Sequence, residues 1–182
     1  MKILICISNV PDTTTKIRFV NDNKAFDTNG VQWIINPWDE LALTRALELK
    51  EASAGAIEKV SVISVGPQSA EPTIRKALAI GADDAVRIDA NPTDAYFVAT
   101  QISEYAKDKG YDMILVGKET VDYNGSQVGG LIAGMLDLPY LPNTSKLDVS
   151  GSTATIERDV QSGEEVMEAQ LPIVLSASKG MA

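Results

Sequence analysis

The sequence contains no histidine and a single cysteine, Cys6, among its 182 residues. Histidine is the commonest general base and the commonest transition-metal ligand, so its absence argues against conventional side-chain catalysis and against a metal site. One cysteine excludes an internal disulfide and any paired-cysteine motif. Cys6 lies inside an apolar run and is predicted to be a small buried thiol, because a reactive thiol needs electropositive, partly exposed surroundings. We therefore expect a protein without catalytic residues of its own.

Long hydrophobic runs and basic clusters are also missing. No apolar run approaches the ~18 residues that a membrane helix needs. The first predicted strand starts at Lys2, which leaves no room for a signal or transit peptide. The formal net charge of −9 argues against binding to nucleic acid or to an anionic membrane surface. We expect a soluble prokaryotic protein of the cytoplasm, with no membrane insertion.

Apolar runs typical of strands alternate with segments of helical periodicity. The predicted strands cover residues 2–8, 59–66, 85–90 and 112–117, and the predicted helices cover residues 38–52, 69–80 and 94–109. Strands that alternate with helices in this way form a parallel sheet connected by right-handed crossovers. The fold class is therefore predicted to be α/β.

Two regions depart from this alternation. Residues 9–37 carry a weak strand at Ile17–Val20 and a turn signal at Asn29-Gly30, and are predicted to form a hairpin. After Leu138, three half-exposed segments resemble antiparallel strands: SKLDVSG, TATIERDV and EVMEAQ. The apolar segment at residues 171–178 is then predicted to return to the main sheet. With no repeat and no low-complexity linker, residues 1–182 are expected to form one domain.

Residues 113–130, MILVGKETVDYNGSQVGG, carry the strongest functional signal. An apolar strand stops at Gly117, a polar loop follows, and a helix begins near Gly125-Ser126. In an open α/β sheet this corner lies at the carboxyl end of a strand, where ligands bind. The free N–H groups and positive dipole at the helix start suit a phosphate. The loop lacks the lysine of a Walker motif and the spacing of a dinucleotide motif.

Structural explanations exist for the same residues. Ser126 can be a plain helix N-cap, worth about 1 kcal/mol. Glycines at positions 129, 130 and 134 have a structural explanation too, which is that they let the helix pack closely on the sheet. At the start of the 38–52 helix, Asn36-Pro37-Trp38-Asp39 carries ordinary helix-start residues. The functional interpretation is that several strand ends meet at one crevice: those after Ile7, Val65 and Val116, with the Asn36–Asp39 segment beside them.

Several motifs together resemble the beta subunit family of electron transfer flavoproteins. They are VPDTTTKI, DTNGV, IINPWDE, ISVGP, RKALAIGAD, ILVGKETVD, SQVGG, IERDV and LPIVLSA. The resemblance implies a doubly wound, mostly parallel sheet of the Rossmann-like, adenine nucleotide alpha hydrolase-like type, with an antiparallel insertion near the C-terminal end. It also implies a heterodimer with an alpha subunit that carries FAD, and AMP, or a second FAD in electron-bifurcating members, bound to the beta subunit.

The resemblance further implies an electron carrier. Family members take electrons from flavin dehydrogenases, such as the acyl-CoA dehydrogenases of fatty acid oxidation, and deliver them to a quinone reductase or another acceptor. The nucleotide contacts of the family, carried onto this chain, fall on Cys6, Asn36, Pro37, Trp38, Asp39, Val65, Thr120, Asp122, Gly125, Ser126, Gln127 and Val128. Asp122 is expected to hold the loop or a ribose hydroxyl, because a phosphate beside it would be repelled.

Some positions differ from the family pattern. Tyr123 and Asn124 stand where many members have acidic residues. Val128 lacks the hydroxyl of the AMP-binding mitochondrial type and resembles the bifurcating type, which leaves AMP and FAD both open. Members continue after a segment like SASKGMA with a partner-recognition loop and an arm that embraces the alpha subunit. Since this chain ends at Ala182, we expect both to be absent from it.

Two other classes share the fold class. A stand-alone ATP-binding regulator of the universal-stress type has a phosphate loop that Gly117 and Gly125-Ser126 loosely match. The antiparallel insertion and the NPWDE segment speak against that alternative. Adenylate-forming pyrophosphatases use an SGGxDS-like loop after their first strand, and SNVPDT does not supply it here.

Overall fold

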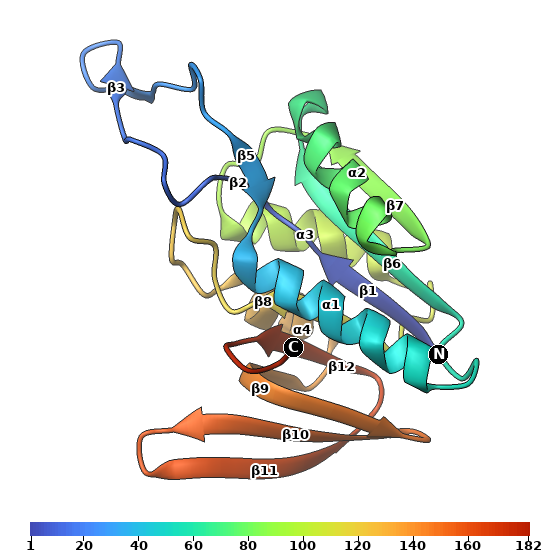
Figure 1. Cartoon of the computed structure of the whole chain (residues 1–182). Helices are drawn as coiled ribbons and strands as arrows, with labels where there is room; N and C mark the ends of the chain where they lie inside the picture. Colours follow the sequence, from blue (N-terminus) through green and yellow to red (C-terminus); the bar gives the residue numbers. More distant parts are fainter.

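A computed structural model describes the whole chain, Met1–Ala182, and its centre is an eight-stranded sheet. The strand order is β11-β10-β9-β12-β8-β1-β6-β7 (Figure 1). Six neighbouring strands run parallel: β1 (Lys2–Cys6), β6 (Lys59–Gly66), β7 (Asp84–Asp89), β8 (Met113–Gly117), β12 (Ile173–Ala177) and β9 (Tyr140–Ser150). The apolar sequences of β1, β6, β8 and β12 follow from burial on both faces of the sheet, whereas the edge strand β7 is only half-buried. The predicted α/β class is confirmed.

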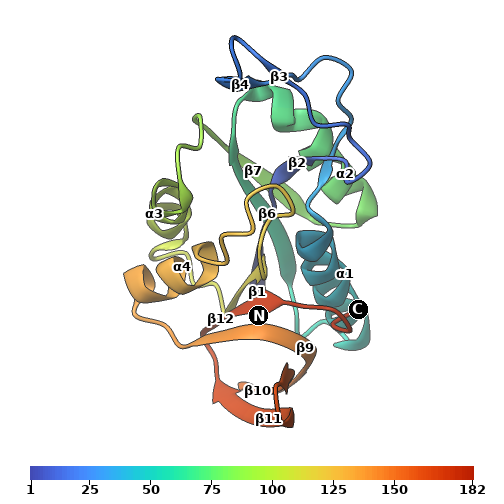
Figure 2. The same ribbon diagram turned by 90° about the vertical axis from the view of Figure 1, so that its left-hand side faces the viewer.

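Helices cover both faces of this sheet (Figure 2). The helices α1 (Pro37–Ala52) and α2 (Glu71–Ile80) lie on one face, and α3 (Ala95–Ala106) and α4 (Val128–Leu136) lie on the other. A short 3₁₀ turn, η1 (Gln68–Ala70), precedes α2. Because helices cover both faces of the sheet, the doubly wound arrangement implied by the family resemblance is confirmed. None of the helices is both long and apolar enough to cross a membrane.

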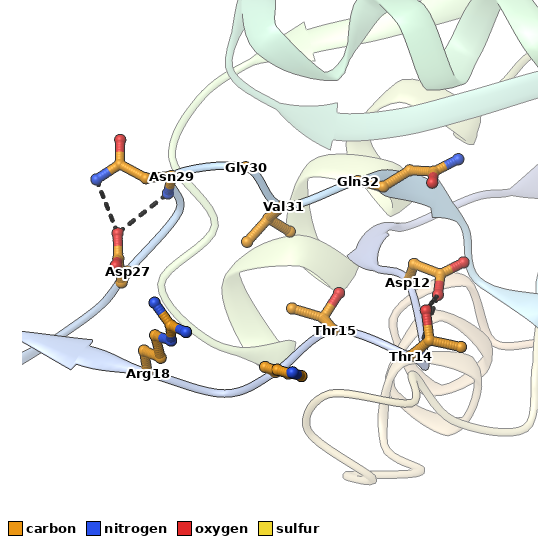
Figure 3. Close-up of a pocket in the computed structure, with 10 residues that line it drawn as sticks. Asp12, Thr14, Thr15, Arg18, Asp27, Asn29, Gly30, Val31 and Gln32 are labelled. Carbon is orange, nitrogen blue, oxygen red and sulfur yellow. Dashed lines mark hydrogen bonds between the residues drawn. The ribbon is translucent and has the colours of Figure 1, made fainter.

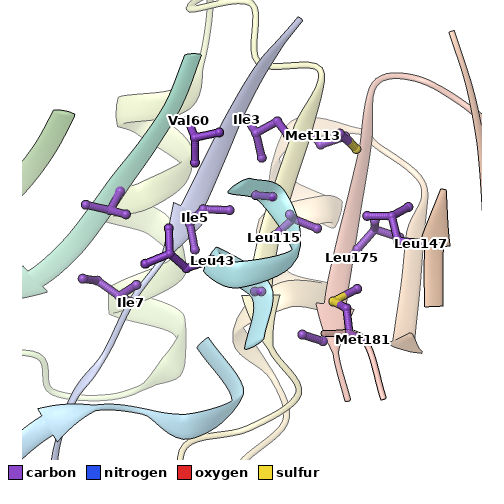
Figure 4. Packing of buried hydrophobic residues seen from close by; sticks show 14 of the residues in the cluster. Ile3, Ile5, Ile7, Leu43, Val60, Met113, Leu115, Leu147, Leu175 and Met181 are labelled. Carbon is purple, nitrogen blue, oxygen red and sulfur yellow. The ribbon is translucent and has the colours of Figure 1, made fainter. Parts of the chain in front are cut away.

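The alternation of side chains along β1 supplies both halves of the core. Ile3 and Ile5 belong to the cluster under α1 and α2, whereas Leu4 and Cys6 belong to the cluster under α3 and α4. Figure 4 shows side chains from several strands gathered around Leu43 of α1, which is fully buried. Burial of one such leucine contributes about 2 kcal/mol.

The order of the strands reverses beside β1. From β1 the chain proceeds outward through β6 to β7 and then returns through α3 to β8, on the other side of β1. The boundary between β1 and β8 is therefore the topological switch point, where the connections leave in opposite directions and ligands bind in α/β sheets. Helix α3 ends three residues before the predicted Lys109, because Lys107 leaves the helical region with ψ 134° and Asp108 has a left-handed φ of 59°.

An insertion between β1 and α1 projects from the carboxyl edge of the sheet (Figure 1). Its base pairs β2 (Asn9–Pro11) with β5 (Trp33–Ile35), and its tip pairs β3 (Phe19–Val20) with β4 (Ala25–Phe26). The predicted hairpin is confirmed, although the strand expected at Ile17–Val20 begins only at Phe19. The tip turns at residues 21–23, which all have left-handed φ, and Asn29-Gly30 forms a second turn nearer the base.

The C-terminal third of the chain extends the sheet with an antiparallel meander. β9 (Tyr140–Ser150), β10 (Thr153–Val160) and β11 (Gly163–Gln170) pair antiparallel with one another, and β12 returns between β8 and β9, parallel to both. The predicted insertion and returning strand are thus confirmed. Arg45 of α1 joins this extension to the main body, because Nε and Nη2 both donate to the carbonyl of Leu147, at 2.9 and 2.7 Å.

Candidate functional site

The side chain of Asp39 joins the ends of the two strands at the switch point. One carboxylate oxygen accepts the N–H of Ser8, just beyond β1, and the other accepts the N–H of Gly117, at the end of β8, both at 2.8 Å. Asp39 lies in the first turn of α1, where an acidic residue is favoured by the helix dipole. Because α1 starts at this edge, that residue faces the gap between the strands and is only 3% exposed.

The environment of Asp39 shifts its titration. Burial raises the pKa of the Asp39 carboxyl from 3.8 to about 7, against the opposing effect of hydrogen bonds from Asn36, Ser8 and Gly117. Taking a carboxylate out of water disfavours its charged form, and donated hydrogen bonds offset only part of that effect. The wall of the switch point therefore contains a carboxyl group that titrates near neutral pH.

Asn36 fixes the loop that follows β8. Its Nδ2 donates to the carbonyl of Glu119 at 2.8 Å, and its Oδ1 accepts the N–H of Val121 at 3.2 Å. The residue is fully buried and lies at the start of α1. Both polar atoms of its side chain are thus used within the protein. In this conformation the side chains of Asn36 and Asp39 shape the site by holding backbone, and the face available to a ligand is that of Pro37 and Trp38.

Gly117 occupies a position with no room for a side chain. A Cβ there would overlap the carboxylate of Asp39 and lie 2.7 Å from Cβ of Trp38. Beside this contact, Nζ of Lys118 lies 4.3 Å from the centroid of the Trp38 ring and 3.8 Å from a carboxylate oxygen of Glu119. A lysine over an indole face is a cation–π contact. The first two residues of the loop are therefore packed onto the start of α1.

The start of α4 has no side-chain cap. Its N-cap residue is Gln127, not Ser126, so the explanation of Ser126 as an N-cap is wrong. The Ser126 hydroxyl instead donates to Oε2 of Glu119 at 3.2 Å. No acceptor in the chain takes the N–H groups of Val128, Gly129 and Gly130. Such free N–H groups at a helix start favour an anion.

The backbone just before α4 adds to this polarity. Ser126 has a left-handed φ of 51°, and Gln127 follows in the right-handed helical region. An alternation of this kind turns successive N–H groups toward one side and forms a concave anion-binding nest. The predicted loop residues Asp122, Gly125, Ser126 and Gln127 are exposed, whereas Thr120 and Val128 are half-buried.

Cys6 and Val65 lie deeper in the fold. Cys6 is buried at the end of β1, and Val65, near the end of β6, packs against the same cluster. Burial raises the pKa of the Cys6 thiol strongly, and the nearby Asp39 raises it further. The prediction of a small buried thiol is confirmed. Both side chains are small and sit below the carboxyl edge of the sheet, as expected for the floor of a site.

One residue that takes part in this arrangement was not singled out from the sequence. Glu119 contacts Asn36 through its carbonyl and Ser126 through its carboxylate. Ser8, the strand end after Ile7 that the sequence placed at this edge, supplies one of the two backbone N–H groups that bind Asp39. In a polar loop, no sequence pattern distinguishes a charged residue that makes specific contacts from one that is simply solvated. The sequence therefore contains no signal for the contacts of Glu119.

A separate hollow of about 410 Å³ lies in the insertion between β1 and α1 (Figure 3). Asp12 and Thr14 are hydrogen-bonded on one side of it, and Asp27 and Asn29 on another. Its lining is almost entirely polar and belongs to residues 12–32. A second hollow, of about 530 Å³, lies between the end of α1 and the β9–β10 turn. Neither includes the strand ends that Asp39 joins.

The fold defines a Rossmann-like α/β protein, a class whose members bind ligands at the carboxyl ends of their strands. The chain belongs to the electron transfer flavoprotein family: residues 24–182 match the model of the electron transfer flavoprotein domain. It is 35% identical over 185 residues to the electron transfer flavoprotein subunit beta of Bacillus subtilis, covering all of this chain and 70% of that protein.

Other relatives agree. The subunit beta of Thermoanaerobacterium thermosaccharolyticum is 36% identical, over 98% of this chain and 68% of the relative. The human subunit beta is 32% identical, over 97% of this chain and 71% of the relative. The resemblance found in the sequence motifs is therefore confirmed, and the coarse function is electron transfer by a flavoprotein subunit.

Proposed function

We propose that this chain is the beta subunit of an electron transfer flavoprotein and holds AMP, or a second FAD, at the switch point between β1 and β8. With an alpha subunit that carries FAD, the heterodimer passes electrons from flavin dehydrogenases, such as acyl-CoA dehydrogenases, to a quinone reductase or another acceptor. The observation that supports the nucleotide site is the uncapped start of α4, which lies at the end of a loop that Asn36 anchors.

The residues present fit a phosphate-bearing ligand. The N–H groups of Val128, Gly129 and Gly130 and the hydroxyl of Ser126 are suitable donors. Gly129 allows the helix to lie close to the sheet, since a Cβ there would meet Val116 and Tyr140 at 2.8 Å. The donors are thus carried by a helix that is tightly seated on β8 and β9.

The base and ribose would lie against the start of α1 and the floor of the site. Asp39 and Asn36 hold the surrounding backbone, while Trp38 offers an aromatic surface. Cys6 and Val65 are small enough to lie under a flat ring. Val128 is apolar and half-buried at the first position of α4, and its neighbourhood is where AMP and FAD would be distinguished.

In this proposal the protein contributes binding and orientation only. A bound flavin supplies the redox chemistry, and the protein positions it and sets its surroundings. The buried thiol of Cys6 is held protonated, so it is not a nucleophile. We further propose that the chain works in the cytoplasm and folds as one domain.

The proposal is tested by purifying the chain together with the alpha subunit of the same organism. The visible spectrum reports flavin, and mass spectrometry of the nucleotides released on denaturation identifies AMP or FAD. One flavin with AMP supports the simple carrier, and two flavins support a bifurcating one. Recovery of ATP with no flavin would contradict the electron-transfer proposal.

The placement of the site has its own test. Replacing Ser126 and Gln127 together by glutamate is expected to remove the bound nucleotide, because two carboxylates would face its phosphate. A matched control changes Gln161 and Ser162, the same residue types in reverse order, which are exposed at the β10–β11 turn. Nucleotide retained in the first variant, or lost from both, would contradict the proposed placement.

A further inference from the structure

We propose that Glu119 is a built-in competitor of the nucleotide phosphate, an inference that rests on the proposed nucleotide site. Its carboxylate accepts the Ser126 hydroxyl at 3.2 Å, immediately before the N-cap of α4. This is one of the donors that a phosphate at the same helix start would use. Glu119 therefore lowers the affinity for phosphate-bearing ligands and sets how strongly the site depends on ligand charge.

The backbone of Glu119 is held beside this position. Its backbone carbonyl is held by Nδ2 of Asn36 at 2.8 Å, and Asn36 is fully buried. The side chain of Glu119 is itself only 22% exposed. Because its backbone is fixed and its side chain is half-buried, the carboxylate of Glu119 lies beside the start of α4 unless a ligand displaces it.

The charges around Glu119 determine the effect on a ligand. The amine of Lys118 lies 3.8 Å from the Glu119 carboxylate, and that amine also lies over the Trp38 ring. One lysine at this distance screens the carboxylate only in part. A phosphate that binds to Ser126 and the first N–H groups of α4 either displaces the Glu119 carboxylate or remains close to it. Both outcomes reduce the net gain from the anion-binding helix end.

A purely structural role predicts something different. If Glu119 only holds the loop, then glutamine, which keeps a side-chain oxygen as acceptor for Ser126, should behave like glutamate. If its charge competes with phosphate, then E119Q should strengthen the binding of charged ligands and leave an uncharged analogue unaffected. Adenosine, which lacks the phosphate of AMP, separates the two roles.

The experiment measures the affinity of the full chain for AMP, FAD and adenosine by isothermal titration calorimetry. The native chain is expected to bind either AMP or FAD, and E119Q should bind that same nucleotide about threefold to fivefold more tightly. The affinity of E119Q for adenosine should stay within about twofold of the native value. The gain should shrink at high ionic strength. E168Q, which removes one exposed carboxylate from the distant edge strand β11, serves as the charge-matched control.

The outcomes are distinguishable. An E119Q variant that binds AMP or FAD no more tightly than the native chain, or that gains equally for adenosine, overturns the role of Glu119 while leaving the nucleotide site intact. An equal gain in E168Q also overturns it, because the effect would then be one of net charge. Absence of binding by AMP and FAD to both native and E119Q proteins overturns the proposed nucleotide site as well.

Discussion

The carboxylate of Asp39 occupies the space that a side chain on Gly117 would need. The two residues are 78 positions apart in the sequence and are joined by a hydrogen bond of 2.8 Å. A Cβ on residue 117 would also lie 3.0 Å from Nδ2 of Asn36. The glycine at the end of β8 is therefore required by the packing of the start of α1 against that strand, with no need for an unusual φ.

Gly117→Ala is expected to lower the free energy of unfolding by about 2–4 kcal/mol, because the methyl group forces Asp39 and Trp38 away from the strand end. Chemical denaturation measures the change. Gly125→Ala is the control, since a Cβ at that position meets nothing within 4 Å. Equal stability of the two variants would show that the start of α1 is not packed as described.

Two glycines of the same helix are expected to respond in opposite directions. In Gly129→Ala the new methyl group meets Val116 and Tyr140 at 2.8 Å, so we expect a loss of about 1–3 kcal/mol. In Gly134→Ala the methyl group meets nothing within 4 Å, and alanine is a better helix former by about 0.5–1 kcal/mol. Thermal unfolding of the pair tests this: a shift of the melting temperature in the same direction for both would contradict the packing of α4.

The protonation of Asp39 links stability to pH. Asp39 titrates near 3.8 in the unfolded chain and near 7 in the folded protein, so the folded state binds the extra proton between these values. The contribution of this group is complete at low pH and is lost as the pH rises through about 7, by up to about 1.4 kcal/mol per pH unit. The difference between native and D39N unfolding free energies, measured from pH 4 to 8, isolates this contribution.

The asparagine side chain of the D39N variant would present an amide N–H to one of the two backbone donors, so this variant should be less stable by about 1–3 kcal/mol at low pH. If D39N is too unstable to study, carbon NMR of the native Asp39 carboxyl provides the same information. A midpoint near 4 would contradict the predicted shift.

Arg45 is expected to hold β9 against α1. Arg45→Ala removes two hydrogen bonds to the Leu147 carbonyl and a 2.9 Å ion pair with Asp148, and should cost about 1–3 kcal/mol. Arg75→Ala, whose side chain is 77% exposed and 3.8 Å from Glu71, should change stability by less than about 0.5 kcal/mol. Equal effects in urea denaturation would mean that the Arg45 contacts add nothing.

Much of the fold could be predicted from the sequence because the central strands of its sheet are buried on both faces. β6, for example, has the bounds predicted from its apolar run, Lys59–Gly66. The bounds of the insertion were harder to predict, since three consecutive residues, Asn21 to Asn23, adopt left-handed φ at its tip. Asn and Asp tolerate a left-handed φ, but their presence in a sequence does not predict it.

The sequence predicts which segments meet at the site, but not which hydrogen bonds their side chains make. The Asn36–Asp39 segment and the loop after Gly117 lie at one edge because parallel strands end there together. Whether the Asn36 amide contacts a ligand or the backbone carbonyl of Glu119, 83 residues later in the sequence, depends on tertiary geometry. The same limit applied to Ser126, whose hydroxyl bonds Glu119 rather than capping α4.

The hydrogen bond from Gly117 to Asp39 also has a consequence for the order of folding. A growing chain presents β1 and α1 early, but the second acceptor oxygen of Asp39 finds its donor only after β8 has been synthesised. Until then the Asp39 carboxyl group is hydrogen-bonded only to the end of β1. The carboxyl edge at β1 and β8 is thus among the last parts of the parallel sheet to form. Protection of the Gly117 amide from hydrogen exchange reports when this hydrogen bond has formed.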